Sequence, residues 1–113
     1  MVKSAWQTLL HRATCRPANS SGSSNTAGAI LKYSLVSGTW TANGSFTTTF
    51  GGFGLAALKQ ASGTYLFVST GAGALTNNSV LRLTDVSNYN TTISINSGNN
   101  ITLYTATGGA IIK

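Results

Sequence analysis

Acidic side chains are almost absent from this chain, because Asp85 is the only one among 113 residues, against seven lysines and arginines. Hydrolytic mechanisms that use two carboxylates are therefore excluded within one chain. Calcium and magnesium sites built from several acidic oxygens are excluded for the same reason. The net charge of +6 permits contact with an acidic partner. The basic residues are scattered, whereas a nucleic-acid interface gathers them on one face, so we do not expect a nucleic-acid partner.

Cysteine and histidine each occur once, as Cys15 and His11. No intrachain disulfide can form, and the two residues supply at most two of the four ligands of a zinc site. Their spacing would place them on one face of a helix. A Cys–His nucleophile pair also needs an orienting group and a pocket. We therefore expect no catalytic residue, no cofactor and no metal ion, and we expect that the protein is not an enzyme.

Charge and long apolar runs are also scarce. No apolar run reaches the roughly 18–20 residues that span a membrane, so we expect no membrane partner. Charged residues make up 7% of the chain, against roughly 25% in typical soluble domains. Glycine, serine, threonine and asparagine fill the gap. Such a polar but uncharged surface favours proteins that live in assemblies, because its burial costs little desolvation of charge.

The N-terminal segment has a different pattern from the rest of the chain. Ser4 and Gln7 have the spacing of a capping box. Apolar residues then recur at helical intervals up to Ala13. The pattern predicts a short amphipathic helix over residues 5–13, which ends before Pro17, the only proline of the chain.

A helix of this length is marginal on its own, so we expect its apolar face to dock. It could dock on its own β domain, on a partner or a neighbouring subunit, or the segment could act as a targeting peptide. Residues 18–28 follow as a linker rich in serine and glycine. We therefore predict an anchor and linker over residues 1–28 and a β domain over residues 29–113. The predicted anchor residues are Trp6, Leu9, Leu10, Arg12 and Arg16.

From Ala29 onward, short stretches of β-branched and aromatic residues alternate with turn signals every 8–12 residues. This spacing predicts an all-β fold, a small antiparallel β-sandwich or jelly roll of about seven to eight strands. Strands are expected over residues 29–36, 39–41, 46–50, 61–70, 80–86, 91–95 and 101–107, with a further edge pairing over 110–112. Residues 55–60 contain helix formers and could be a helix or a strand, and we favour a strand.

Several details of these strands are predicted as well. The run 61–70 is expected to be the central strand, covered on both faces. In the strand over 29–36, Leu31, Tyr33 and Leu35 alternate with polar residues, which predicts that these three face the core. Asn43-Gly44 is expected to form a hairpin turn, because both positions tolerate positive φ. Residues 51–54 are expected to form a loop or tight bend.

Two stretches carry a resemblance to a known family. The sequence Gly-Thr-Tyr-Leu-Phe at 63–67, followed by Thr-Ile-Ser-Ile-Asn-Ser-Gly-Asn-Asn-Ile-Thr-Leu-Tyr at 92–104, resembles the latter part of trimeric jelly-roll domains. That superfamily includes tumour-necrosis-factor-like and complement globular-head domains, and phage fibre, spike and decoration proteins use similar folds. The resemblance implies a homotrimer packed through aromatic and aliphatic faces, without catalysis. Tyr65, Phe67 and Tyr104 are the residues expected at the subunit interface or in the core.

These observations favour a non-enzymatic structural protein of a virion, such as a phage decoration, cement, spike or fibre subunit. Such a subunit would oligomerise through its β domain, with a trimer favoured, and attach to other capsid or tail proteins through its N-terminal arm. A carbohydrate- or surface-binding module is the alternative, with Trp40 and Tyr89 among the aromatic contacts. A coat subunit whose basic arm touches nucleic acid is a third possibility, which a steep dependence of affinity on salt would support.

Overall fold

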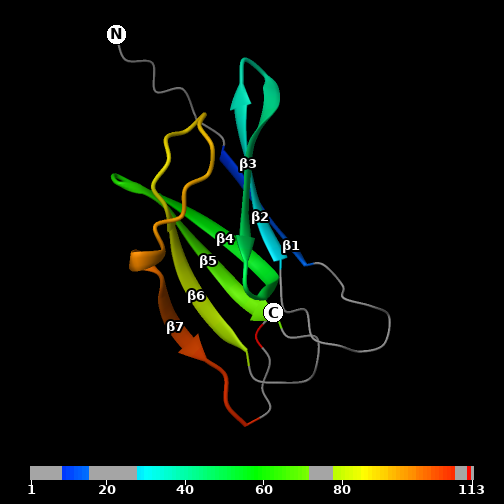
Figure 1. Cartoon of the computed structure of the whole chain (residues 1–113), viewed down its shortest axis with the longest axis vertical. Coiled ribbons are helices and arrows are strands. Elements are labelled where there is room, and N and C mark those ends of the chain that lie inside the picture. Colours follow the sequence, from blue (N-terminus) through cyan, green and yellow to red (C-terminus); the bar gives the residue numbers. More distant parts are fainter. Residues whose placement is uncertain (1–8, 16–27, 72–77, 109–111, 113) are drawn as a thin grey trace.

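The structure is a computed structural model, and it describes residues 9–15, 28–71, 78–108 and 112. These residues form two antiparallel sheets, so the all-β prediction is confirmed (Figure 1). The first sheet has the order β1 (Leu9–Cys15), β2 (Gly28–Val36) and β3 (Thr39–Thr48). The second sheet has the order β4 (Gly51–Gln60), β5 (Gly63–Gly71), β6 (Ser79–Asp85) and β7 (Ile101–Thr105).

The predicted N-terminal helix is wrong where the structure describes it. Residues Leu9–Cys15 form strand β1, which runs antiparallel to β2 from the pair Leu9–Ser34 to the pair Cys15–Gly28. A nine-residue helix would be marginal by itself, whereas the strand gains a ladder of hydrogen bonds to β2. Part of the predicted anchor therefore belongs to the three-stranded sheet. Residues 5–8 lie outside the described residues.

The hairpin between β2 and β3 turns earlier than its strongest turn signal predicts. Ser37 and Gly38, with φ of 48° and 80°, make the turn, and the hairpin projects beyond the four-stranded sheet (Figure 1). Asn43-Gly44 instead lies inside β3, where the register shifts opposite Lys32. Gly44 keeps a φ of 75° there. The dipeptide thus supplies the positive φ of a β-bulge rather than that of a turn.

Strand β5 lies between β4 and β6, as expected for a central strand. It is not covered equally on both faces, because Leu66 and Val68 are at most 1% exposed, whereas Tyr65 and Phe67 are only partly buried. Its pattern is therefore the alternation of a strand with one core face. The expected loop at residues 51–54 is the start of β4, which carries a bulge at this point. The strand prediction over 55–60 is confirmed.

One hydrophobic core joins the two sheets. It contains Ile30 of the three-stranded sheet together with Leu66, Val68 and Leu83 of the four-stranded sheet. Ile93 completes it from the segment between β6 and β7. The strand expected at residues 91–95 is reduced to a single bridge between Asp85 and Ile95. A short 3-10 helix, η1 (Ser97–Asn99), precedes β7.

No helix in the described part of the chain is long and apolar enough to cross a membrane.

Candidate functional site

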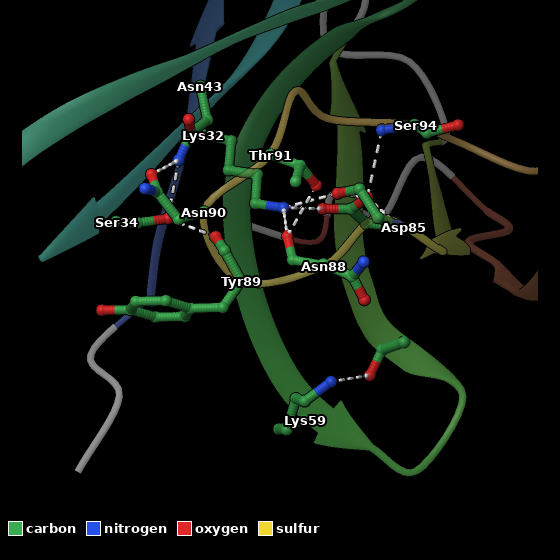
Figure 2. A network of polar contacts seen from close by, with 12 residues as sticks. Lys32, Ser34, Asn43, Lys59, Asp85, Asn88, Tyr89, Asn90, Thr91 and Ser94 are labelled. Atoms are coloured by element: carbon green, nitrogen blue, oxygen red, sulfur yellow. Dashed lines mark hydrogen bonds and ion pairs between the residues drawn. The ribbon is translucent and has the colours of Figure 1, made fainter. Parts of the chain in front are cut away.

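The most unusual feature of the interior is a buried charged pair that links the two sheets. Lys32 of β2 and Asp85 at the end of β6 are both 1% exposed. Lys32 Nζ lies 3.4 Å from Asp85 Oδ2. The only acidic side chain of the chain is therefore held inside the fold against a lysine from the opposite sheet (Figure 2).

The residues around this pair satisfy its remaining hydrogen-bonding groups. Lys32 Nζ donates to Ser87 Oγ at 2.5 Å and to the Asn88 carbonyl at 2.6 Å. Asp85 Oδ1 accepts from the Ser87 hydroxyl at 2.6 Å, from the Ser87 amide at 3.0 Å and from the Ser94 amide at 3.1 Å. An ammonium has three donors, and Lys32 thus reaches three oxygen atoms. A charge can stay buried only when it is paired and hydrogen-bonded in this way.

A second set of polar contacts continues from the charged pair along β2. Ser34 donates its hydroxyl hydrogen to the Tyr89 carbonyl and accepts from Asn43 Nδ2 at 2.7 Å. Asn43 Nδ2 also lies 3.1 Å from Asn90 Oδ1. The bulge in β3 places Asn43 on the core side, where it is 8% exposed. These contacts fix the segment after β6 against β2 (Figure 2).

The hydroxyl of Tyr89 forms hydrogen bonds with the backbone of β2. Its hydroxyl donates to the Leu35 carbonyl at 2.8 Å and accepts from the Leu35 amide at 2.9 Å. Within the described residues the register of β1 with β2 reaches Ser34, and the phenol pairs with the backbone of the next residue, Leu35. Tyr89 was a candidate sugar contact, and this pairing gives its polar end a structural role.

Replacing Tyr89 with phenylalanine is expected to lower the free energy of unfolding by about 1–2 kcal/mol, because the Leu35 amide and carbonyl both lose their partner. Urea denaturation at constant pH measures the change. Tyr104→Phe is the matched control, since Tyr104 is 58% exposed and should change stability by less than about 0.5 kcal/mol. Equal losses in the two variants would contradict this role of Tyr89.

The buried pair shows an error in the predicted orientation of β2. The sequence placed Leu31, Tyr33 and Leu35 toward the core, but the inner positions are Ile30, Lys32 and Ser34, each at most 1% exposed. The predicted alternation of the strand was correct, but the two faces were exchanged, so the residues expected inside lie outside. A signal for the true phase does exist: the one charged residue of this strand, Lys32, and the one acid of the chain, Asp85, are natural partners.

The inverted phase leaves apolar side chains on the outer face of the three-stranded sheet. The register places Leu35 opposite Trp40 and Tyr33 opposite Ala42 on this face. Trp40 is 47% exposed, while Tyr33 and Leu35 are half-buried. We call the outer-face residues Leu31, Tyr33, Leu35, Trp40 and Ala42 the uncharged stripe.

The three residues predicted at a subunit interface or in the core lie on the outer face of the four-stranded sheet. Tyr65 and Phe67 of β5 are half-buried, with ring centroids 6.5 Å apart in an edge-to-face arrangement. Tyr104 of β7 pairs in register with Val80 and is 58% exposed. Together with Leu58, which is 52% exposed, they give this sheet an apolar outer surface.

The predicted anchor residues are only partly described. The backbone of Leu9, Leu10 and Arg12 lies in β1, while Trp6 and Arg16 lie outside the described residues. His11 also lies in β1, so the helix face that it was expected to share with Cys15 does not form. Within the described ranges, no group of three or more histidine, cysteine, aspartate or glutamate residues could hold a metal ion.

Comparison of the chain with protein-family models, with curated proteins and with solved structures finds no match.

Proposed function

We propose that the chain is a non-enzymatic structural subunit of a virion, such as a phage decoration, cement, spike or fibre protein. In this proposal its two sheets form a small sandwich of the jelly-roll type, and the subunit forms a homotrimer through this β domain. It attaches to other capsid or tail proteins through the parts of its N-terminal segment that lie outside β1, which include Trp6 and Arg16.

The uncharged stripe is the observation that carries the self-association. It combines aromatic and aliphatic side chains on one sheet face, and β2 and β3 place no charged residue on it. The register puts Arg12 of β1 opposite Leu31, at the far end of the stripe from Trp40. Two copies of a chain with a net charge of +6 repel each other. A contact between copies is therefore best made where a face carries no charge, and the part of the stripe around Tyr33, Leu35 and Trp40 meets this condition.

The composition supports the assembly role independently. Only 7% of the residues are charged, which favours large contacts with little desolvation of charge. The buried network is consistent with a structural role, because it ties the segment after β6 to β2 and leaves Asp85 1% exposed. Its polar groups are engaged with one another, and this arrangement stabilises the fold.

A carbohydrate-binding module is the second proposal, and the exposure of Trp40 is the observation that favours it. An exposed indole near the tip of a projecting hairpin can stack on a sugar ring. Glycan-array binding that is lost in Trp40→Ser would support this alternative. A loss of glycan binding only in Tyr89→Phe would not support this alternative, because that variant removes the hydrogen bonds to the Leu35 backbone.

The Trp40→Ser variant tests the self-association directly. We expect sedimentation to give a trimer for the natural protein and a monomer, or at least tenfold weaker association, for Trp40→Ser. Leu58→Ser is the matched control, because Leu58 is equally exposed but lies on the other sheet. A trimer that persists in Trp40→Ser, or a loss of association only in Leu58→Ser, would contradict the assignment of the uncharged stripe.

A further inference from the structure

Arg82 is an arginine on a mainly apolar surface, and its Nε has no acceptor among the described residues. It lies on the outer face of the four-stranded sheet, opposite Phe67 of β5 and Ile101 of β7. Its Cζ lies 4.4 Å from the centroid of the Tyr65 ring. Its Nε is buried and has no hydrogen-bond partner among the described residues. The only acidic side chain of the chain pairs with Lys32, so the Arg82 guanidinium has no carboxylate beside it, and this position favours a bound group of negative charge.

A second copy of the chain has no side-chain carboxylate to offer Arg82. Asp85 is the only acidic side chain, and it is 1% exposed and held by Lys32 of its own subunit. Two copies brought together on this face would place arginine near arginine, which is unfavourable. The charge inventory therefore indicates a partner other than a second copy for this face.

The surroundings of Arg82 indicate a protein as that partner. Leu58 and Tyr104 are more than half exposed on the same face. A shallow hollow of about 260 Å³ lies beside Phe67, where Gly54, Ala56 and Ser69 supply little side-chain bulk. A saccharide site needs several polar groups that converge on the sugar, whereas the described residues around Arg82 are mainly aromatic and aliphatic.

We propose that this face binds a different protein of the assembly, which presents a carboxylate side chain to the Arg82 guanidinium. Apolar side chains next to that carboxylate enter the hollow beside Phe67. The guanidinium and a carboxylate match each other in a two-pronged hydrogen bond, and the Tyr65 ring holds the guanidinium plane in place. This inference rests on the proposed assembly role, because it names the kind of neighbour that covers the second sheet.

A pair of model peptides tests the charge requirement in the full-length protein. The probes are acetyl-Leu-Glu-Phe-amide and its glutamine counterpart, titrated into isotope-labelled protein and followed by NMR. We expect the acidic peptide to shift the Arg82 Nε–H signal and the Tyr65 ring signals with a saturable dissociation constant in the millimolar range. The glutamine peptide should bind at least tenfold more weakly.

Arg82→Gln and Lys59→Gln each remove one positive charge. Comparing them distinguishes binding at Arg82 from a general attraction of the acidic peptide to a positively charged protein. Arg82→Gln should weaken binding of the acidic peptide at least tenfold, and Arg82→Lys should weaken it several-fold, because lysine lacks the planar fork. Lys59→Gln should change it less than twofold, since Lys59 is an exposed residue of β4. Thermal unfolding of each variant verifies that the fold is kept.

Three results would overturn the inference: no shift at Arg82, equal binding of the two peptides, or equal losses in Arg82→Gln and Lys59→Gln. Tighter binding of 3′-sialyllactose than of the acidic peptide at the same signals would also overturn it, in favour of an acidic saccharide. The sedimentation mass of Arg82→Gln should stay that of the natural protein. A failure at Arg82 is thus distinguishable from a failure of self-association, which would appear as a monomeric natural protein.

Discussion

Replacing Asp85 with asparagine is expected to lower the free energy of unfolding by about 3–5 kcal/mol, because the Lys32 ammonium then stays buried without its counter-charge. Both side chains are 1% exposed, so water cannot take the place of the missing carboxylate. The loss should also loosen the segment after β6, since Asp85 Oδ1 accepts hydrogen bonds from Ser87 and Ser94. Urea denaturation and amide hydrogen exchange of Ser87 and Ser94 measure the two effects.

Two further variants test whether the charge is the cause. Lys32→Met combined with Asp85→Asn should recover part of the stability that Asp85→Asn alone loses, because no unpaired charge remains buried. Lys59→Met removes a lysine from an exposed position and should change stability by less than about 0.5 kcal/mol. A loss below about 1 kcal/mol in Asp85→Asn would show that the pair does not stabilise the fold as described.

Replacing Gly63 with alanine is expected to lower the free energy of unfolding by at least about 2–3 kcal/mol, the range of severe overpacking. Gly63 begins β5 with a φ of 146°, and a Cβ at this position would lie 2.4 Å from the Asp85 carbonyl oxygen. That oxygen belongs to the backbone of β6, so it cannot move away as a side chain could. The substitution therefore combines backbone strain with a forced separation of β5 and β6.

Gly38→Ala is the matched control for this prediction. Gly38 has a φ of 80°, but a Cβ there would meet no atom within 4 Å. Gly38→Ala should therefore lower the free energy of unfolding by only about 1–2 kcal/mol, the cost of placing alanine in the left-handed backbone conformation. Thermal unfolding of the two variants compares the effects directly. Equal shifts in the midpoint would mean that the close approach of Gly63 to Asp85 is not a constraint on the fold.

Local patterns predicted the strands well, since they depend on short-range alternation and on turn residues. The strands β2, β5 and β6 each begin and end close to the expected positions. The turn at Ser37-Gly38 lies in the gap between the strands expected over 29–36 and 39–41. The phase of β2 could not be predicted in this way, because Lys32 is stable inside only when Asp85 lies opposite it. That contact joins residues far apart in the chain, and no local pattern contains it.

Contacts with other segments also account for the errors at the N-terminus and at Asn43. The helix prediction used residues 5–13 alone, whereas β2 supplies the ladder that makes Leu9–Cys15 a strand. The Asn43-Gly44 turn signal was outweighed by the burial of the Asn43 amide next to Ser34. The aromatic residues Tyr65, Phe67 and Tyr104 were chosen from sequence, and they do share one sheet face. Their exposure could be seen only once the sheet was assembled.

The mass of the full-length protein in solution, measured by light scattering over a range of concentrations, tests the proposed assembly role most directly. We expect a stable species of about three times the chain mass of 11.6 kDa. The intact chain is needed, because a version that starts at Ala29 would lose β1 and expose the edge of β2. A monomer of 11.6 kDa at every concentration would contradict self-association through the uncharged stripe.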